Sequence, residues 1–471
     1  MSGIASAIKL IESGQTDFTV YEKADRVGGT WRENTYPGVT CDVPSHLYRY
    51  AFSPNPNWSH MFSPGDEIER YFESVANDYD VNPYIRFNDE VTSCVFKNAK
   101  WHIATRSGLS DEVDVVIAAT GVLHHPNYPE IDGLRSFKPP MFHSAQWDHS
   151  VDLDDARVGV IGTGSTAVQI VSAIIDQVRS LSLFQRTAQW ILPISNPDYS
   201  EEEKESFRKN PERMRETYEF FSKMFTEGFA DAVVDADSPQ MKAIEEACVR
   251  NLEDNVHDPE LRERLRPDYR AACKRLIVSA SFYDSIQKPN AHLVTEGIER
   301  IEESGVRTRD GQLHELDVLV LATGFKADAF MRPMKVSGRD GVELSDVWAK
   351  RPNAYLSISI PDFPNFFMLN GPNGPVGNFS LIEVAELQID YVMQLVDTIR
   401  SRRCREISAT KEAMDTLDAA RIEAAKQTVW TTGCHSWYLD DRGVPANWTW
   451  TFERFREVMA KPDLGAYEFV G

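Results

Sequence analysis

The sequence has 471 residues, and its 50 basic and 72 acidic side chains give a formal net charge of −22 at pH 7. This excess of negative charge repels nucleic acid and anionic membrane surfaces and excludes both as general partners. The length allows about three domains. Because no apolar run is longer than a strand, we expect no signal peptide, no membrane span and a cytoplasmic protein. Six scattered cysteines predict free thiols in that reducing compartment.

The first predicted elements form the second half of a nucleotide-binding unit. A helix over residues 2–11, closed by Gly14, leads into a strand at residues 18–21 that ends at Glu22. An acidic residue in this place binds a ribose hydroxyl in mononucleotide-binding βαβ units. Gly3 takes the place of the fingerprint's third glycine, 19 residues before Glu22, but no strand and Gly-x-Gly turn come before it. We expect either a misassigned start codon or the loss of the first strand.

Loops and short strands are predicted next. Residues 24–64 are rich in glycine and proline, and loops of this length within a compact domain are usually functional. A helix is expected at residues 65–79, and strands are expected at 91–96 and 101–105. Val113–Ala119 is apolar except for Asp114, and we expect one strand buried on both faces here.

A complete nucleotide-binding fingerprint follows. A buried strand at residues 157–161 runs into Gly162-x-Gly164-x-x-Ala167, and a helix continues to about residue 178. Gly162 permits the tight turn, Gly164 lets the backbone approach a pyrophosphate, and Ala167 permits close packing of the helix on the strand. The N–H groups of the first helical turn then bind the phosphates.

The end of the next strand indicates which dinucleotide binds here. Residues 181–184 form this strand, and Gln185-Arg186-Thr187 follows without a carboxylate for the ribose diol of NADH. An arginine and a hydroxyl suit the 2′-phosphate of NADPH. With Glu22 at an unphosphorylated ribose, the sequence predicts one site for FAD and one for NADPH, as in a reductive flavoenzyme.

After residue 200 the composition and the apolar periodicity of the chain change. Residues 200–272 are charged, poor in β-branched residues and helical in periodicity, and they predict an inserted helical subdomain. A strand signal returns at Leu313–Ala322 and closes on an Ala-Thr-Gly segment. Long helices are expected at residues 381–400 and 410–427.

Four features resemble class B flavoprotein monooxygenases over nearly the whole chain. They are Gly28-Gly-Thr-Trp31, Cys41-Asp42-Val-Pro-Ser-His-Leu-Tyr48, the Ala-Thr-Gly segments ending at Gly121 and Gly324, and Phe137-x-Pro139-x-x-x-His143-x-x-x-Trp147-Asp148. The last is similar to the Baeyer–Villiger fingerprint, Phe-x-Gly-x-x-x-His-x-x-x-Trp followed by Pro or Asp, with Pro139 in place of the glycine. The related heteroatom-oxidising enzymes carry an aromatic and a basic residue where this chain has Trp147 and Asp148.

The resemblance implies an α/β fold with two dinucleotide-binding, Rossmann-like domains, one for FAD and one for NADP, and a helical insertion. The first strand of the FAD domain is expected to be missing. The FAD domain would comprise residues 1–135 and 326–471, the NADP domain 140–195 and 273–325, and the insertion 196–272. We expect loops and the helices of the insertion to line the substrate pocket.

The motifs and the resemblance together assign the site residues. Lys274 and Arg275 match the family's Lys-Arg pair, so that Lys274 would join the 2′-phosphate site and Arg275 would be the catalytic arginine, paired with Asp42. The expected FAD-binding residues are Gly3, Glu22, Gly29, Thr30, Trp31, Asp42, Tyr48 and Val91. The expected NADP-binding residues are Gly162, Gly164, Ser165, Thr166, Arg186, Thr187, Lys274, Arg275 and Trp437. The interdomain fingerprint residues are Phe137, His143, Trp147 and Asp148, with a conformational role for the histidine; no metal site is predicted.

The implied reaction inserts one oxygen atom of O2 beside the carbonyl of a small-molecule ketone, consumes NADPH and gives an ester or lactone. In the family, reduced FAD forms a C4a-peroxyflavin, whose negative charge Arg275 would stabilise while Asp42 orients the guanidinium. Two alternatives stay open: a flavin monooxygenase that oxidises N or S of a small molecule, and a truncated, flavin-free NADP-binding remnant. The sequence predicts neither the particular ketone nor the oligomeric state.

Overall fold

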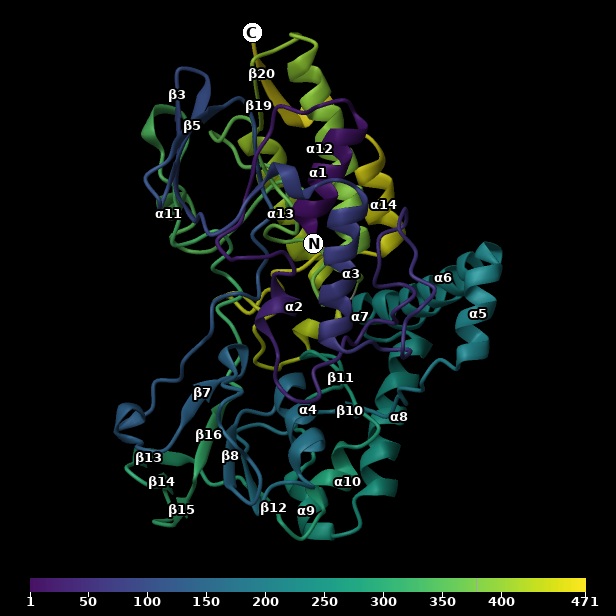
Figure 1. The fold of residues 1–471 in the computed structure, drawn as a ribbon, viewed down its shortest axis with the longest axis vertical. Helices are drawn as coiled ribbons and strands as arrows, with labels where there is room; N and C mark the ends of the chain where they lie inside the picture. Colours follow the sequence, from purple (N-terminus) through teal and green to yellow (C-terminus); the bar gives the residue numbers. More distant parts are fainter. Residues whose placement is uncertain (378) are drawn as a thin grey trace.

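The computed structural model describes residues 1–377 and 379–471. Figure 1 shows three regions along the long axis of the molecule. A parallel sheet with its covering helices lies at one end, and small sheets with long helices from both halves of the chain lie at the other. A group of helices, coloured teal, projects from the side between them.

The parallel sheet carries the complete nucleotide-binding unit. In order across the sheet, its strands are β12 (Ala291–Val294), β9 (Ser180–Phe184), β8 (Arg157–Ile161), β16 (Val318–Leu321) and β7 (Met141–His143). One face packs on helices α4 (Ser165–Ile174) and α10 (Phe282–Ile286), and the other on a small antiparallel sheet of β13 (Ile298–Glu302), β14 (Gly305–Thr308) and β15 (Leu313–Glu315). Because both faces are covered, every residue of β16 is buried, which explains its continuous apolar sequence.

The opposite region contains several small sheets. Two are parallel pairs: β1 (Val20–Tyr21) with β2 (Ile85–Arg86), and β6 (Val116–Ala118) with β18 (Phe366–Met368). The others are a four-stranded sheet, β17 (Lys335–Ser337), β3 (Val91–Lys97), β4 (Lys100–Thr105) and β5 (Ser110–Val113), and the antiparallel pair β19 (Glu406–Ala409) and β20 (Tyr467–Val470). Within the described residues, β1 and β6 share no hydrogen bonds, so the two parallel pairs remain separate sheets.

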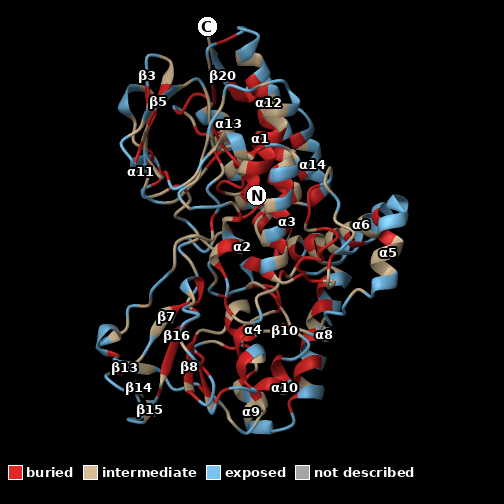
Figure 2. Ribbon diagram, viewed as in Figure 1, coloured by how far each residue is buried: buried red, intermediate tan, exposed pale blue. Residues whose placement is uncertain are grey.

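Long helices cover these sheets. They are α1 (Ser2–Glu12), α3 (Gly65–Asp78), α12 (Leu381–Arg400), α13 (Lys411–Ala425) and α14 (Phe452–Ala460), with the short α2 (Thr30–Glu33) and α11 (Leu344–Val347). Helix α12 contacts both α1 and α14, and its apolar residues recur at helical spacing on one buried face. Figure 2 shows this buried core along α1 and α12, and a second core along β8, β16 and α10.

All regular elements between residues 201 and 264 are helices. The α-helices are α5 (Glu201–Lys209), α6 (Pro211–Phe225), α7 (Asp231–Val234), α8 (Pro239–Asn255) and α9 (Pro259–Arg264), and a π-helical turn at Thr226–Ala230 joins α6 to α7. The helices connect β10 (Ile191–Leu192) to β11 (Ile277–Val278), which pair in parallel. Helices α5, α6, α8 and α9 each begin at a Ser, Asn or Asp whose side chain accepts a hydrogen bond from the first turn. In α6, α8 and α9, a proline follows at a position that needs no N–H donor.

Two segments that predicted single strands are each divided between two sheets. Val113–Ala119 separates into β5, which pairs with β4, and β6, which pairs with β18. Leu313–Ala322 separates into β15 and β16, and Asp317 at the break accepts hydrogen bonds from the Arg157 guanidinium. The first break falls at Asp114, which is exposed and pairs with Lys100 at 2.7 Å, so in both segments an aspartate separates the two strands.

The prediction of six free thiols is wrong for two cysteines. Cys273 and Cys434 form a disulfide across a sequence separation of 161 residues. The other four, Cys41, Cys94, Cys248 and Cys404, are buried thiols. Spacing could not reveal this pair, because only the tertiary fold brings the two segments together.

The disulfide leads to a prediction about stability. Replacing Cys434 with serine is expected to lower the free energy of unfolding by about 5 kcal/mol, because the bond restricts a long loop in the unfolded chain. Denaturant unfolding without reductant measures the difference, and the gap between variant and wild type should largely close when a dithiol is added. Equal stability without reductant, or six titratable thiols in the unreduced, unfolded protein, would contradict the bond.

Candidate active site

A cavity of about 2840 Å³ separates the parallel sheet from the region that contains α1 and α12. Pockets for one small molecule measure about 300–1,000 Å³, so this cavity has room for two dinucleotides and a substrate. Its lining includes all of the residues predicted for the two cofactors: Gly3, Glu22, Gly29, Thr30, Trp31, Asp42, Tyr48, Val91, Gly162, Gly164, Ser165, Thr166, Arg186, Thr187, Lys274, Arg275 and Trp437.

The expectation that the inserted helices line this cavity is wrong. The described lining residues pass from Gln189 directly to Lys274. Helices α7 and α8 instead pack against Trp430 and Tyr438 of a C-terminal segment, residues 429–439, which lies between them and the cavity. The lining therefore depends on a segment that the helical periodicity of the insertion could not indicate.

The N-terminus of α1 and the end of β1 meet at the predicted FAD ribose site. A Cβ atom added to Gly3 would lie 3.8 Å from Cβ of Ala119 and 4.0 Å from Cγ1 of Val20, so the helix begins between the ends of β6 and β1. No described side chain caps α1, and the N–H groups of its first turn are open to a phosphate. Glu22 accepts a hydrogen bond from the Ala24 amide at 2.9 Å and keeps further lone pairs for a ribose hydroxyl.

The loop after β1 carries more of the residues predicted for FAD. Gly29 has a φ of +57°, and an added Cβ atom there would meet nothing within 4 Å. Helix α2 begins directly after it at Thr30. Trp31 donates through Nε1 to the Tyr48 hydroxyl at 3.2 Å, and burial raises the pKa of Tyr48 well above its usual value. Val91 adds an apolar contribution to the cavity wall from β3.

Asp42 and Arg275 form an ion pair in the cavity wall, although 233 positions separate them in the sequence. Arg275 donates through Nε to Asp42 Oδ2 at 3.1 Å, through Nη2 to the same oxygen, and through Nη1 to the Gly377 carbonyl at 3.2 Å. Burial alone would lower the pKa of Arg275, but the Asp42 carboxylate and the Tyr438 hydroxyl more than offset this and raise it. The site therefore holds a permanently charged guanidinium in a fixed orientation.

The turn after β8 has the form that the fingerprint predicts. Gly162 has a φ of +121°, and an added Cβ atom would lie 2.2 Å from the Ala322 carbonyl oxygen, so only glycine fits beside the end of β16. A Cβ atom on Gly164 would meet nothing within 4 Å, because this residue lines the cavity. In the described chain α4 has no side-chain cap, so the N–H groups of its first turn are free to bind a pyrophosphate.

Arg186, Thr187 and Lys274 lie in the cavity wall beside this turn. Thr163 donates through Oγ1 to the Thr187 carbonyl at 2.8 Å and ties the turn to the loop after β9. The Lys274 ammonium lies 4.5 Å from the centre of the Tyr269 ring. Burial lowers the pKa of Lys274, and the nearby charge of Arg186 adds to this effect. A dianion such as a 2′-phosphate would relieve the repulsion between the two cations.

The fingerprint residues lie outside the cavity lining. His143, at the end of β7, accepts a hydrogen bond through Nδ1 at 3.1 Å from the amide two residues further on, so Nε2 carries the proton and donates to the Gly324 carbonyl at 3.1 Å. Burial lowers the pKa of His143 and favours this neutral form. Phe137 is buried, Trp147 packs edge-on against a neighbouring ring, and Asp148 is exposed. This arrangement supports a structural role for the histidine.

Tyr438, which was not among the assigned site residues, contacts Arg275. The predicted residue, Trp437, lines the cavity and is 47% exposed, whereas Tyr438 is buried and lies close enough to the arginine to raise its pKa. A Cβ atom on Gly377 would lie only 2.1 Å from the Tyr438 hydroxyl oxygen, so the phenol lies against the same backbone that Arg275 contacts. Trp437 indicated this region, but not that the neighbouring ring turns inward.

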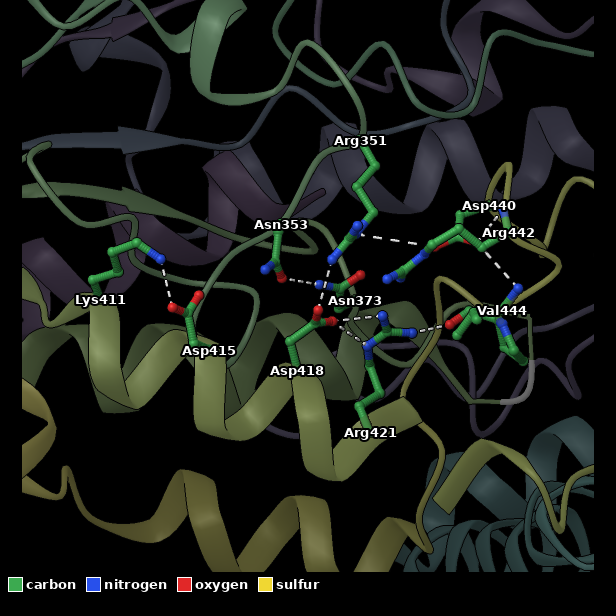
Figure 3. Close-up of polar contacts among 11 residues, drawn as sticks. Arg351, Asn353, Asn373, Lys411, Asp415, Asp418, Arg421, Asp440, Arg442 and Val444 are labelled. Carbon is green, nitrogen blue, oxygen red and sulfur yellow. Dashed lines mark hydrogen bonds and ion pairs between the residues drawn. The ribbon is translucent and has the colours of Figure 1, made fainter. Parts of the chain in front are cut away.

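A network of ion pairs joins α13 to the loop that contains Asp440, two residues after this tyrosine (Figure 3). Asp418 on α13 accepts hydrogen bonds from Arg351 at 2.7 Å and from Arg421 at 2.6 Å, and Arg421 also donates to the Pro445 carbonyl. Asp440 lies 4.0 Å from Nε of Arg351. Together with the disulfide at residue 434, these contacts hold the segment at both ends and fix the tyrosine beside the Asp42–Arg275 pair.

The residues around the cavity fit FAD and NADP. Two uncapped helix N-termini, those of α1 and α4, open on the same space and can each bind a pyrophosphate. Glu22 suits an unphosphorylated ribose, and Arg186 with Lys274 suits a phosphorylated one. The Asp42–Arg275 pair lines the same cavity.

Comparisons with known proteins agree with this geometry. Residues 1–208 match the family model described as flavin-binding monooxygenase-like. The chain is 46% identical over 441 residues to an uncharacterized monooxygenase of Mycobacterium tuberculosis, covering 94% of this chain and 88% of that one. It is 37% identical over 480 residues to a Baeyer–Villiger monooxygenase of Streptomyces coelicolor, covering 99% and 90%. A crystal structure of cyclohexanone monooxygenase from Rhodococcus sp. bound to NADP+ matches with a TM-score of 0.88 and 28% identity, covering 99% of this chain and 97% of that one. The chain therefore belongs to the Baeyer–Villiger monooxygenases, which are flavin-binding monooxygenases.

Proposed function

We propose that this monooxygenase, which uses FAD and NADPH to insert oxygen, converts a small-molecule ketone, O2, NADPH and a proton into an ester or lactone, water and NADP+. The observation that carries the proposal is the Asp42–Arg275 pair in the wall of the cavity that both nucleotide sites share. When bound, FAD accepts a hydride from NADPH and then supplies one oxygen atom of O2 to the substrate. The flavin-free alternative loses support, because the family model and the relatives are those of flavin enzymes.

Arg275 is proposed to stabilise the negative charge that develops beside the reacting carbonyl. Its guanidinium is held by Asp42 on one side and by the Gly377 carbonyl on the other, and its pKa is raised, so it is a charged donor in place before the reaction begins. Such preorganised donors act strongly in a site that excludes water. Asp42 and Tyr438 position this cation and are assigned no proton transfer.

Arg186, Thr187 and Lys274 are proposed to bind the 2′-phosphate of NADPH, with the pyrophosphate at the N-terminus of α4. The support is their common place on the cavity wall and the lowered pKa of Lys274 beside a second cation. Gly3, Glu22 and the other residues assigned to FAD line the remaining part of the same wall.

We further propose that one more strand belongs between β1 and β6 in the FAD domain. Each of these strands has one partner and one free edge among the described residues, and the cavity lining includes residues of both. A strand ending in a Gly-x-Gly turn would join the two pairs into one sheet and lead into α1. The test adds such a leader and compares FAD bound per chain, which should rise; an unchanged ratio would count against the strand.

We also propose three domains and a cytoplasmic location for the protein. The domains are 1–135 with 326–471 for FAD, 140–195 with 273–325 for NADP, and 196–272 for the insertion. Disulfides seldom persist in a reducing compartment, and Cys273 and Cys434 are both buried, so the test labels their thiols in cell extract that has been acid-quenched and denatured. Labelling of both residues supports the cytoplasm, and protection of both argues against it.

Product analysis tests the proposed reaction. The purified enzyme, loaded with FAD, is supplied with NADPH, O2 and either a ketone or a sulfide, and the products are identified by mass spectrometry. We expect an ester or lactone from the ketone, with NADPH consumption that depends on it. Sulfoxide formation without any ester across a panel of ketones would favour the heteroatom oxygenase instead.

A further inference from the structure

A short segment from the proposed FAD domain packs against helix α4 of the proposed NADP domain. This segment, residues 36–42, follows α2 and leads to Asp42. Tyr36 is buried in the same core cluster as α4 and the parallel sheet. Its hydroxyl donates to Oε1 of Gln169 on α4 at 2.8 Å, and the Gln169 amide donates back to both the carbonyl and the hydroxyl oxygen of Thr40 at 3.1 Å. One glutamine therefore binds both ends of the loop.

Gly38 brings the two backbones into direct contact. It has a φ of +80°, and an added Cβ atom would lie 2.8 Å from the carbonyl oxygen of Gln169 and 2.9 Å from Cβ of Ala173. Both the left-handed conformation and the close approach require glycine. The loop therefore lies directly on α4, with no room for a side chain between them.

The position of this contact connects three parts of the site. Gln169 lies about one helical turn after Ser165, where α4 begins and the NADP pyrophosphate is expected. The loop begins shortly after Thr30 and Trp31 at the flavin site and ends at Asp42, which pairs with Arg275. A shift of the loop on α4 would therefore change the distance between the nicotinamide and the flavin and would move the arginine as well.

We propose that Gln169, together with Tyr36, is a positioning residue that sets the distance and angle for hydride transfer from NADPH to FAD. The inference rests on the proposed function of the two nucleotide sites. Transfer between two bound groups needs reacting atoms about 3–3.5 Å apart, and a misplacement of about 1 Å can cost about 100-fold in rate. Gln169 acts through the loop and is assigned no contact with either cofactor.

Replacement of Gln169 with leucine tests the proposal in the FAD-loaded enzyme. The rate of flavin reduction by NADPH, followed anaerobically by stopped-flow absorbance, is expected to fall about ten-fold or more. FAD content and the Kd of NADP+ should stay close to wild type, and more NADPH should be consumed per ester formed. Gln177→Leu is the matched control, because this glutamine follows α4 on an exposed surface, and it should reduce at the wild-type rate.

Two further variants separate positioning from a general loss of structure. Gln169→Glu keeps the acceptor for Tyr36 but loses the donor to Thr40, and it should recover part of the reduction rate. Tyr36→Phe should slow reduction, and combining it with Gln169→Leu should add little, because both changes break the same contact. Variants that melt at a lower temperature than the wild type but reduce their flavin at the wild-type rate would overturn the proposal.

The two levels of failure can be told apart. If the wild-type enzyme binds FAD but NADPH does not reduce it, the proposed function itself fails. If NADPH reduces the flavin of the wild type, and the flavins of Gln169→Leu and Gln169→Glu are reduced at the wild-type rate, only the positioning role is excluded.

Discussion

Replacing Arg275 with alanine is expected to lower ester formation by at least about 10²–10³-fold, the usual effect of removing one preorganised donor from a site of developing negative charge. Anaerobic reduction of the flavin by NADPH should continue, because the hydride is transferred between the two cofactors. Ester yield by mass spectrometry and stopped-flow flavin absorbance measure the two steps separately. NADPH should then be oxidised without matching ester.

Two companion variants sharpen this test. Arg275→Lys keeps the charge but loses the fork that binds Asp42 and Gly377 together, and it should retain only part of the activity. Asp42→Asn removes the partner that fixes the guanidinium, and it should reduce ester yield less than the alanine variant does. An Arg275→Ala enzyme with wild-type ester yield would exclude the assigned role.

The second large effect concerns the choice of nicotinamide cofactor. Replacing Arg186 with alanine is expected to lower kcat/KM for NADPH by about 10–100-fold, which corresponds to the loss of one charge-assisted contact of about 1.5–3 kcal/mol to the 2′-phosphate. NADH lacks that phosphate, so its kcat/KM should change little. The ratio of the two values in one preparation is the measurement.

A matched control comes from the same domain. Arg179 is exposed and pairs with Asp155 at the opposite end of the parallel sheet, so Arg179→Ala should leave the ratio unchanged. Lys274→Ala should move the ratio in the same direction as Arg186→Ala, because both cations are assigned to one phosphate. Equal losses with NADPH and NADH in the Arg186 variant would contradict the assignment.

The parts of the site that could be predicted from sequence are those encoded locally. Gly162 indicates its turn because the backbone conformation and the close approach permit little else, and the apolar periodicity of residues 381–400 predicts α12 with its observed ends. The resemblance brought Asp42 and Arg275 together as a pair, and the structure places them in hydrogen-bonding contact.

The features that sequence reasoning missed depend on contacts between distant segments. Three of them join residues more than 100 positions apart, and no spacing in the sequence reveals them. They are the disulfide, the contact of Tyr438 with Arg275, and the hydrogen bonds of Gln169 to the loop at Tyr36. The inserted helices do not line the cavity for a similar reason: the distant C-terminal segment at Trp430 lies between them and the cavity. Within Val113–Ala119, the charged Asp114 between β5 and β6 was the one local sign that the run divides between two sheets.

We propose that one cavity holds a flavin and a nicotinamide, and that one oxygen atom of O2 is transferred there to a ketone beside Arg275. The most direct test of this proposal supplies the FAD-loaded enzyme with NADPH, a simple cyclic ketone and ¹⁸O2, and measures the mass of the lactone. The account predicts one ¹⁸O atom in each lactone and one NADPH consumed for each lactone formed. Unlabelled lactone, or NADPH-dependent lactone formation by protein without FAD, would contradict it.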